Sequence, residues 1–304
     1  MFANKVMMVR PVDFAFNSET GEDNEFQQHM DLSAQQIREG ALTEFSNAVE
    51  QLKSLDIEVM VLEKADKPQQ TPDAVFPNNW FATDVKGNIY LFPMKTQNRR
   101  REVRVDAVKA LLQQQGVSAV DVICVENAEQ ILEGTGAIVF DHAKKLAYAA
   151  LSERCHESLL NQFCQQIGYQ PVSYCTCSSS GHPIYHTNVV MSVGQDFVVA
   201  CVASIVQSDR QRFVDTVQNS GKTLVEISLD QMEQHYCGNI LELHSRSGQR
   251  ILALSQRAWA GFTEQQQAFF ESRMTICAND ITTIETIGGG SMRCMLAEVF
   301  NPAA

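Results

Sequence analysis

Helical periodicity recurs five times along this chain, and each helical segment is flanked by extended segments rich in β-branched or aromatic residues. The segment centres lie roughly fifty to sixty residues apart, a spacing typical of a repeated structural unit. No Pro/Ser-rich linker or low-complexity tract divides the chain. We therefore expect residues 1–304 to form one α/β domain of five βα units around a centre. The expected helices are 33–55, 100–114, 152–167, 208–220 and 263–273.

Hydroxyl side chains stand where four of these helices should begin. Serine and threonine are favoured N-caps because their oxygens accept a hydrogen bond from the free N–H groups of the first turn. The expected N-caps are Ser33, Ser152, Ser208 and Thr263. The expected strands are 57–62, 80–83 paired with 89–92, 137–140 with 146–150, 189–193 with 197–201, 223–227, 241–243 with 250–254, and 281–284 with 294–299.

Composition excludes several classes of protein. The chain has 304 residues, 44% of them hydrophobic, which is enough to bury a large core. Its formal charge of −12 disfavours nucleic acid and anionic membranes as partners, and Glu102 interrupts the only arginine-rich run, 99–104. We expect a small-molecule substrate, no nucleic-acid partner and no membrane partner. A homodimer is one assembly that the sequence leaves open.

The nine cysteines are odd in number and irregularly spaced, and Cys175 and Cys177 lack the spacing of a zinc site. Residues 1–12 contain no apolar core of signal-peptide length, and no apolar run approaches the length of a membrane span. These features predict a cytoplasmic protein whose thiols are free.

A glycine-rich segment near the C-terminus carries a candidate nucleophile. Gly288, Gly289 and Gly290 permit a tight backbone course, and Arg293 and Cys294 follow them. A thiol in a glycine-lined, cationic setting is expected to have a lowered pKa. The alternative is that Cys294 is a buried filler, as most cysteines in a chain of this kind are.

Two further residues fit the same chemistry. Glu133 begins a Glu-Gly-Thr-Gly motif before an expected strand, and His186 begins His-Thr-Asn before another. Alone, the first could be a turn residue and the second a structural histidine. Together with Cys294 they provide a nucleophile, an acid/base and a carboxylate. No metal-ligand spacing links the three, so we expect covalent catalysis without a metal or another cofactor.

Six motifs in order carry a family resemblance. They are Asp-Ala-Val-Phe-Pro-Asn-Asn-Trp at 73–80, Asn-Arg-Arg-Arg-Glu at 98–102, Glu-Gly-Thr-Gly at 133–136, Leu-Ser-Glu-Arg at 151–154, His-Thr-Asn at 186–188 and the glycine-rich segment with Cys294. With them the chain resembles the guanidino-group-modifying enzymes, which include arginine deiminase, dimethylarginine dimethylaminohydrolase and the amidinotransferases. Phe-Pro-Asn-Asn-Trp and His-Thr-Asn-Val are most similar to the citrulline utilisation hydrolase, or arginine-deiminase-related, branch.

The resemblance covers most of the chain, firmly from about residue 70 to the end. It implies a five-bladed αβ propeller, the pentein fold, with pseudo-fivefold ββαβ units around a central active site. This implied fold agrees with the five helices expected from periodicity.

The resemblance also implies residue roles. Cys294 would be the nucleophile, His186 the general acid/base and Glu133 the carboxylate that holds the substrate's nitrogens. The other implied substrate-binding residues are Asp73, Phe76, Asn78, Arg99 or Arg100, and Arg154. Arg154 would pair with the α-carboxylate of the substrate, although surface salt bridging is the alternative role for these arginines.

Two departures from the deiminase pattern bear on the substrate. Asn79 and Asn188 stand where deiminases carry aspartates that pair with a guanidinium. An aspartate only accepts hydrogen bonds and is favoured opposite a cation, whereas an asparagine both donates and accepts. Amides at both positions suit a neutral urea, the group at the end of citrulline. Amides could still bind guanidinium if Glu133 supplied the charge.

We therefore expect a cysteine-dependent hydrolase that cleaves a C–N bond of a ureido or guanidino amino acid, with citrulline as first choice. Arginine deiminase or amidinotransferase chemistry on a guanidino substrate is the alternative within enzymes. A non-catalytic binding protein with the same fold is a further alternative, but it would have no chemical reason to keep Cys294, His186 and Glu133 together.

Overall fold

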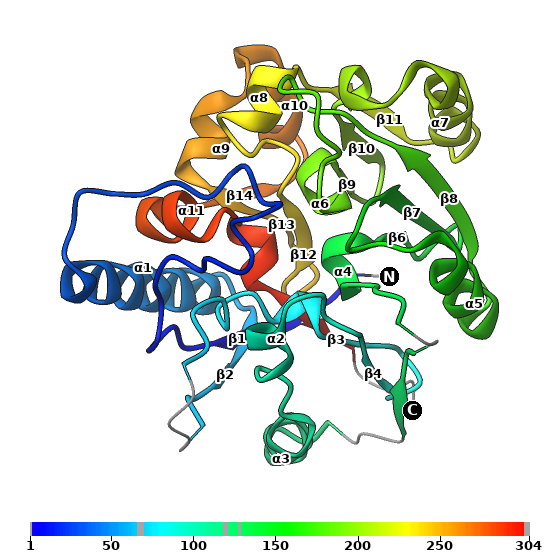
Figure 1. Ribbon diagram of the computed structural model, residues 1–304. Coiled ribbons are helices and arrows are strands. Elements are labelled where there is room, and N and C mark those ends of the chain that lie inside the picture. Colours follow the sequence, from blue (N-terminus) through cyan, green and yellow to red (C-terminus); the bar gives the residue numbers. More distant parts are fainter. Residues whose placement is uncertain (1, 66–69, 118–120, 127–128, 301–304) are drawn as a thin grey trace.

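The computed structural model describes residues 2–65, 70–117, 121–126 and 129–300. Their strands form five three-stranded sheets, which Figure 1 shows arranged around a centre. In every sheet one pair of neighbours is antiparallel and the other is parallel. A parallel pair needs a crossover connection, and here each crossover carries a helix, so each sheet belongs to one ββαβ unit. The expected fold, a five-bladed αβ propeller of the pentein type, is confirmed.

Each blade has an inner, a middle and an outer strand. In that order the blades are β15 (Ala297–Val299), β1 (Lys5–Val9), β2 (Glu58–Leu62); β3 (Phe81–Thr83), β4 (Ile89–Leu91), β5 (Val122–Cys124); β6 (Val139–Asp141), β7 (Leu146–Leu151), β8 (Gln170–Cys175); β9 (Met191–Val193), β10 (Phe197–Ala200), β11 (Thr223–Glu226); and β12 (Leu241–His244), β13 (Arg250–Ser255), β14 (Thr275–Asn279). Lys5 of β1 lies opposite Val299 of β15, so the first and last strands share a blade.

Five longer helices lie on the outside of the ring in Figure 1. They are α1 (Ala34–Ser54), α3 (Val105–Gln114), α5 (Glu157–Ile167), α7 (Gln207–Asn219) and α10 (Glu264–Glu271). The shorter turns are η1 (Pro77–Asn79), α2 (Gln97–Arg100), α4 (Gly134–Ala137), α6 (Thr187–Val190), η2 (Val202–Ser204), α8 (Leu229–Glu233), α9 (Gln256–Gly261), α11 (Thr282–Gly288) and η3 (Met292–Met295).

Helix α1 illustrates how a blade is held together. Ser33 caps it with a full capping box, as expected, and Thr263 does the same for α10. On its inner side α1 buries Phe45 and Leu52 in the core. Burying each such side chain contributes about 1.5–3 kcal/mol, so the apolar stripe, more than helix propensity, fixes the helix on its blade.

Two other expected N-caps are wrong. Ser152 donates a hydrogen bond from Oγ to the Tyr185 carbonyl, and α5 begins only at Glu157. Helix α7 begins at Gln207, one residue before Ser208, and has Val206 at its N-cap. The hydroxyl of Ser152 serves a turn, which sequence alone does not distinguish from a cap.

The expected helix 100–114 is interrupted, and α2 and α3 occupy its place. The chain turns between them because Glu102 points inwards, where its carboxylate accepts hydrogen bonds from Arg99 at 3.1 and 3.0 Å. A buried charge that is paired in this way overrides local helix propensity.

The expected strand 281–284 is also wrong, because these residues begin helix α11. Its β-branched residues suggested a strand, but the Glu44 carboxylate of α1 accepts hydrogen bonds from the Thr283 and Ile284 N–H groups at 2.8 and 3.0 Å. The carboxylate therefore satisfies the start of the helix. Strand β15, expected within 294–299 and paired with 281–284, pairs with β1. Strands β1, β5, β8 and β14 were not expected from the sequence.

Candidate active site

Polar residues gather at the centre because each inner strand is entered through a short turn. Turn α4 contacts both η1 and α6, and η1 contacts η3. These contacts bring together residues that are far apart in the sequence. The segments 137–140 and 189–193 were expected to be strands throughout, but each begins inside one of these turns.

The two glycines of the Glu-Gly-Thr-Gly motif permit this close packing. A Cβ on Gly134 would lie 2.4 Å from the Asn78 carbonyl oxygen, and φ at this glycine is +45°. A Cβ on Gly136 would lie 2.2 Å from Asn79 Nδ2 and 2.8 Å from His186 Nδ1. Any larger residue at either position would push the blades apart. Asn79 and His186 therefore both face the same small space.

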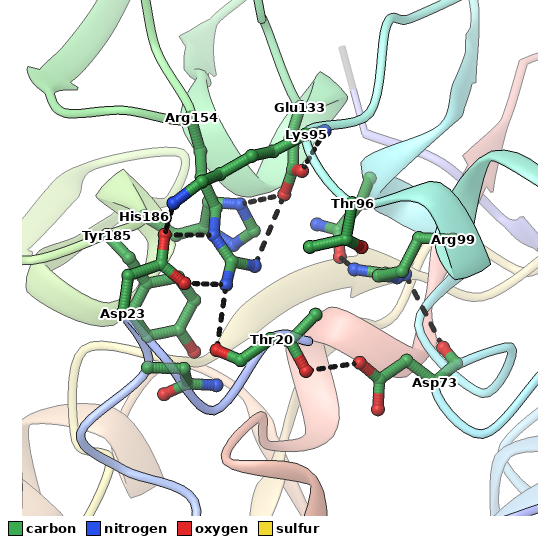
Figure 2. Close-up of polar contacts among 12 residues, drawn as sticks. Thr20, Asp23, Asp73, Lys95, Thr96, Arg99, Glu133, Arg154, Tyr185 and His186 are labelled. Carbon is green, nitrogen blue, oxygen red and sulfur yellow. Dashed lines mark hydrogen bonds and ion pairs between the residues drawn. The ribbon is translucent and has the colours of Figure 1, made fainter. Parts of the chain in front are cut away.

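Glu133 and His186 form a buried carboxylate–imidazole pair at this centre (Figure 2). His186 Nε2 lies 2.8 Å from Glu133 Oε2, and the Lys95 backbone N–H donates to Oε1 at 2.9 Å. Burial would raise the pKa of Glu133, but Arg154 and His186 outweigh it and hold that pKa well below its usual range. Burial lowers the pKa of His186 despite the nearby carboxylate. At neutral pH the imidazole is therefore neutral beside an ionised Glu133.

Arg154 is buried beside this pair and is already engaged with carboxylates. Its Nη1 lies 3.5 Å from Glu133 Oε2, and it forms a two-point ion pair with Asp23. Its guanidinium carbon lies over the Tyr185 ring, 5.0 Å from the ring centre. Figure 2 draws both side chains next to Asp23. Lys95 Nζ binds the same Asp23 at 2.8 Å. Asp23 belongs to the segment 10–32, which connects β1 to α1.

Arg99 and Asp73 line another side of the centre. Arg99 donates from Nη1 to Asn79 Oδ1 at 2.6 Å and from Nη2 to the Phe76 carbonyl at 3.0 Å. Asp73 Oδ2 accepts from Thr20 Oγ1 at 2.9 Å, and burial raises the pKa of Asp73.

Arg100 lies apart from these residues. It is exposed and donates from Nε to the Met94 carbonyl at 2.8 Å and from Nη2 to the Lys95 carbonyl at 3.2 Å. Of the two arginines in the motif, Arg99 is therefore the one that reaches the centre.

Cys294 is buried, with 3% of its surface exposed, and lies in η3. Its Sγ accepts hydrogen bonds from Asn188 Nδ2 and Asn239 Nδ2, both at 3.2 Å. Burial raises the pKa of the thiol; Asn239 and the nearby Arg293 offset only part of this effect. The expectation of a lowered thiol pKa is therefore wrong, because desolvation outweighs the cationic neighbour. All nine cysteines are free thiols.

The glycine-rich segment makes room for Phe76. A Cβ on Gly288 or Gly290 would lie 2.8 or 3.0 Å from the Phe76 ring. The Gly290 position is also 3.4 Å from the Cys294 Cβ, so this ring forms an apolar wall next to the nucleophile candidate.

Several buried polar atoms around the centre have no hydrogen-bond partner within the described residues. Such atoms are uncommon in native proteins, since an unpaired buried polar group costs about 1–3 kcal/mol. They are Asp73 Oδ1, both amide atoms of Asn78, Asn79 Nδ2 and Asn188 Oδ1. A polar ligand with both donors and acceptors would satisfy them.

This centre is enclosed. A cavity of about 600 Å³ lies beside β1 and α2, with Arg10, Arg101 and Arg104 in its wall, but Cys294 and His186 do not line it. The segment 10–32 covers this centre: Asn24 and Gln27 donate to the Gly289 and Gly288 carbonyls.

No cluster of metal-ligating side chains occurs within the part of the chain that the structure describes. Among the same residues, no helix is long and apolar enough to cross a membrane.

Sequence reasoning missed Asn239, Asp23 and Lys95. Asn239 stands two residues before the inner strand β12, as Asn79 stands two residues before β3. Counting back from each inner strand would have found it. Asp23 and Lys95 lie in loops with no motif, and only the fold brings them to Arg154.

Comparison with known proteins agrees with this fold. The family model described as "N,N dimethylarginine dimethylhydrolase, eukaryotic" matches residues 10–301. No curated protein sequence matches the chain. Among solved structures, the N-terminal domain of ArgZ, an arginine dihydrolase from the ornithine-ammonia cycle in cyanobacteria, is similar with a TM-score of 0.74 and 15% identity over 98% of both chains.

Two other structures show the same fold. Unliganded AgrE has a TM-score of 0.76 and 13% identity over 99% of this chain and 40% of its own. A dimethylarginine dimethylaminohydrolase variant, an adduct with S-methyl-L-thiocitrulline, has a TM-score of 0.67 and 14% identity over 98% of this chain and 100% of its own.

Proposed function

The chain belongs to the N,N dimethylarginine dimethylhydrolase family, in the guanidino-group-modifying pentein superfamily, and we propose that it hydrolyses a C–N bond of a ureido or guanidino amino acid through Cys294. One observation carries the proposal. Asn188, two residues after His186, donates to Cys294 Sγ at 3.2 Å, so the turn α6 brings the acid–base pair and the thiol to one centre. Nucleophile, base and orienting carboxylate in one place are the parts that covalent hydrolysis needs.

The proton states define the first step. The raised pKa of Cys294 and the lowered pKa of His186 leave both groups neutral at rest. Glu133 binds His186 Nε2, so Nδ1 is free to take the thiol proton as sulfur adds to the substrate carbon. His186 then delivers this proton to the leaving nitrogen as the C–N bond breaks.

The second step repeats the proton transfer with water. The first step leaves a carbamoyl or amidino group on Cys294 Sγ. His186, neutral again, takes a proton from water as the oxygen adds to the same carbon, and the C–S bond then breaks. The imidazolium returns its proton to the sulfur, which restores the thiol. Glu133 stabilises the imidazolium in both steps.

Charge around the centre favours a neutral ureido group, and hence citrulline. Glu133 is the carboxylate nearest His186, and Arg154 already pairs with it. The unpaired atoms of Asn79 and Asn188 are a donor and an acceptor, which match the carbonyl oxygen and NH₂ group of a urea. A guanidino substrate is the second candidate, because the unpaired Asp73 Oδ1 could accept from a cation.

Substrate choice can be tested directly. We expect purified protein incubated with citrulline, arginine, agmatine and methylarginines to consume citrulline fastest, as measured by chromatographic separation of the products. Faster consumption of arginine would replace citrulline with the guanidino alternative. Consumption of none would contradict the proposed function.

Asn79→Asp is expected to shift preference from the ureido to the guanidino substrate. Arg99 already donates to Asn79 Oδ1, so one carboxylate oxygen would keep that contact. The other oxygen would replace the unpaired Nδ2 donor, repel a urea oxygen and attract a guanidinium. The repulsion and the attraction together are worth about 1–3 kcal/mol, so the ratio of kcat/KM values for citrulline and arginine should fall roughly tenfold to a hundredfold. An unchanged ratio would show that Asn79 does not face the reacting group.

Arg154→Ala is expected to raise KM for α-amino acid substrates more than for their decarboxylated analogues. In this proposal Arg154 exchanges Asp23 for the substrate carboxylate. A charge-assisted pair is worth about 1.5–3 kcal/mol, or roughly tenfold to a hundredfold. Comparing KM for arginine with KM for agmatine, or for citrulline with its decarboxylated analogue, checks this role. Equal effects on both members of a pair would exclude it.

A further inference from the structure

The sulfur of Cys294 has two side-chain donors within hydrogen-bond distance in the described structure, and both are carboxamides. His186, the proposed acid/base, is hydrogen-bonded to Glu133 and not to the sulfur. A buried thiolate needs hydrogen bonds, because no water replaces them. The two amides are therefore the side chains that can hold the sulfur as its charge develops, beside the Ser291 backbone N–H.

Asn239 is placed for this role by the glycine before it. A Cβ on Gly238 would lie 2.2 Å from the Val189 carbonyl oxygen, so only glycine lets this part of the chain approach α6 so closely. As a result the Asn239 side chain, which is fully buried, reaches Cys294 from the entry to β12, in the blade next to that of Asn188.

The orientation of the Asn239 amide is fixed. Nδ2 donates one hydrogen bond to the Asn188 carbonyl at 3.0 Å and another to Cys294 Sγ at 3.2 Å, which uses both of its hydrogens. Its Oδ1 lies 3.6 Å from the same sulfur, within the range of an S–H donor. One amide thus offers an acceptor to the thiol and a donor to the thiolate.

We propose that Asn239 is a further catalytic residue, which holds the Cys294 sulfur in both of its protonation states. As a thiol, Cys294 donates its proton towards Oδ1. Once this proton has moved to His186, the thiolate accepts from Asn239 Nδ2 and Asn188 Nδ2. This role rests on the proposed function of Cys294 as the nucleophile, and it gives the segment that leads into β12 a part in the chemistry.

A purely structural role is the competing explanation, because Asn239 also ties its loop to the Asn188 backbone. The two roles differ in what they control. Loss of a tether lowers the free energy of unfolding and leaves the thiol's titration in place. Loss of a donor to the sulfur makes the thiolate harder to form by about tenfold to a hundredfold, a rise of one to two pKa units.

The experiment measures the alkylation rate of Cys294 by iodoacetamide from pH 6 to 11, with Cys294 identified by mass spectrometry of the digested protein. Asn239→Ala and Asn239→Asp are compared with the wild type. Asp has the shape of Asn but cannot donate when ionised, and it adds a negative charge beside the sulfur. We expect both variants to move the pH midpoint of alkylation upwards by at least about one unit, with Asp moving it further.

Asn279→Ala is the matched control. Asn279 is also a buried asparagine beside a cysteine, with Nδ2 3.5 Å from Cys277 Sγ, but it lies at the end of β14, away from the centre. Its loss should leave the Cys294 midpoint unchanged. An unshifted midpoint in Asn239→Ala, or a wild-type midpoint in Asn239→Asp, would overturn the proposal. The alkylation experiment uses no substrate, so it does not depend on the proposed function. If that function were wrong, the substrate test would show no turnover while the variants still shifted the pH midpoint of alkylation.

Discussion

Cys294→Ser is expected to reduce turnover by on the order of a thousandfold or more while the protein stays folded. A serine hydroxyl is far harder to ionise than a thiol, and its oxygen would give a less reactive leaving group in the second step. Asn188 and Asn239 can donate to a hydroxyl as they do to the sulfur, so the local structure should persist. Product formation under single-turnover conditions and thermal unfolding of the same sample measure the two effects.

Cys277→Ser is the control for that substitution. Cys277 is buried, like Cys294, and also has an asparagine amide next to its sulfur, but it lies in strand β14. We expect a loss of stability at most. Full activity in Cys294→Ser would contradict the covalent mechanism. Loss of activity in Cys277→Ser without unfolding would mean that a thiol other than Cys294 is the nucleophile.

The ring of five blades was predictable because each blade repeats one strong local signal, an amphipathic helix between extended segments. The errors fall where a tertiary contact decides the local structure. Glu44 caps α11 from another helix, and Glu102 turns inwards to bind Arg99. Hydrophobic periodicity does not reveal either contact. The predictions of a strand at 281–284 and of an unbroken helix at 100–114 were therefore wrong.

The candidate site was predictable where a motif places the residue next to a glycine or a strand entry. Glu133 and His186, each at the start of such a motif, are hydrogen-bonded to each other. The thiol's pKa was not predictable, because the sequence shows Arg293 but not the burial that outweighs it. Asp23 was missed because it lies in a loop with no recognisable motif. Only the folded chain brings this loop to Arg154.

Glu133→Gln is expected to lower kcat/KM by about a hundredfold to ten-thousandfold, the usual contribution of general acid–base catalysis. The amide would keep the size of the side chain and one acceptor, but it could not stabilise a positively charged His186. The buried Arg154 would lose one of its carboxylate partners, leaving Asp23. We expect a loss of about 1–3 kcal/mol in the free energy of unfolding, measured with denaturant at pH 7.

Glu242→Gln separates catalysis from stability. Glu242 is a buried carboxylate that binds a histidine, His244, at 3.0 Å and an arginine, Arg250, at 2.8 Å, as Glu133 does, but these residues belong to β12 and β13. This variant should lose stability without losing turnover. Equal loss of activity in both variants would mean that Glu133 acts only on the fold.

The stability deficit of Glu133→Gln also has an expected pH dependence. Because the folded-state pKa of Glu133 lies below its unfolded value, the carboxylate contributes its full stability above the unfolded pKa of about 4.3 and loses it as pH falls towards the folded pKa. The gap between wild type and Glu133→Gln should therefore be widest near neutral pH and narrow below about pH 4. A gap that stays constant down to the acid limit of the folded state would mean that Glu133 is not held ionised by Arg154 and His186.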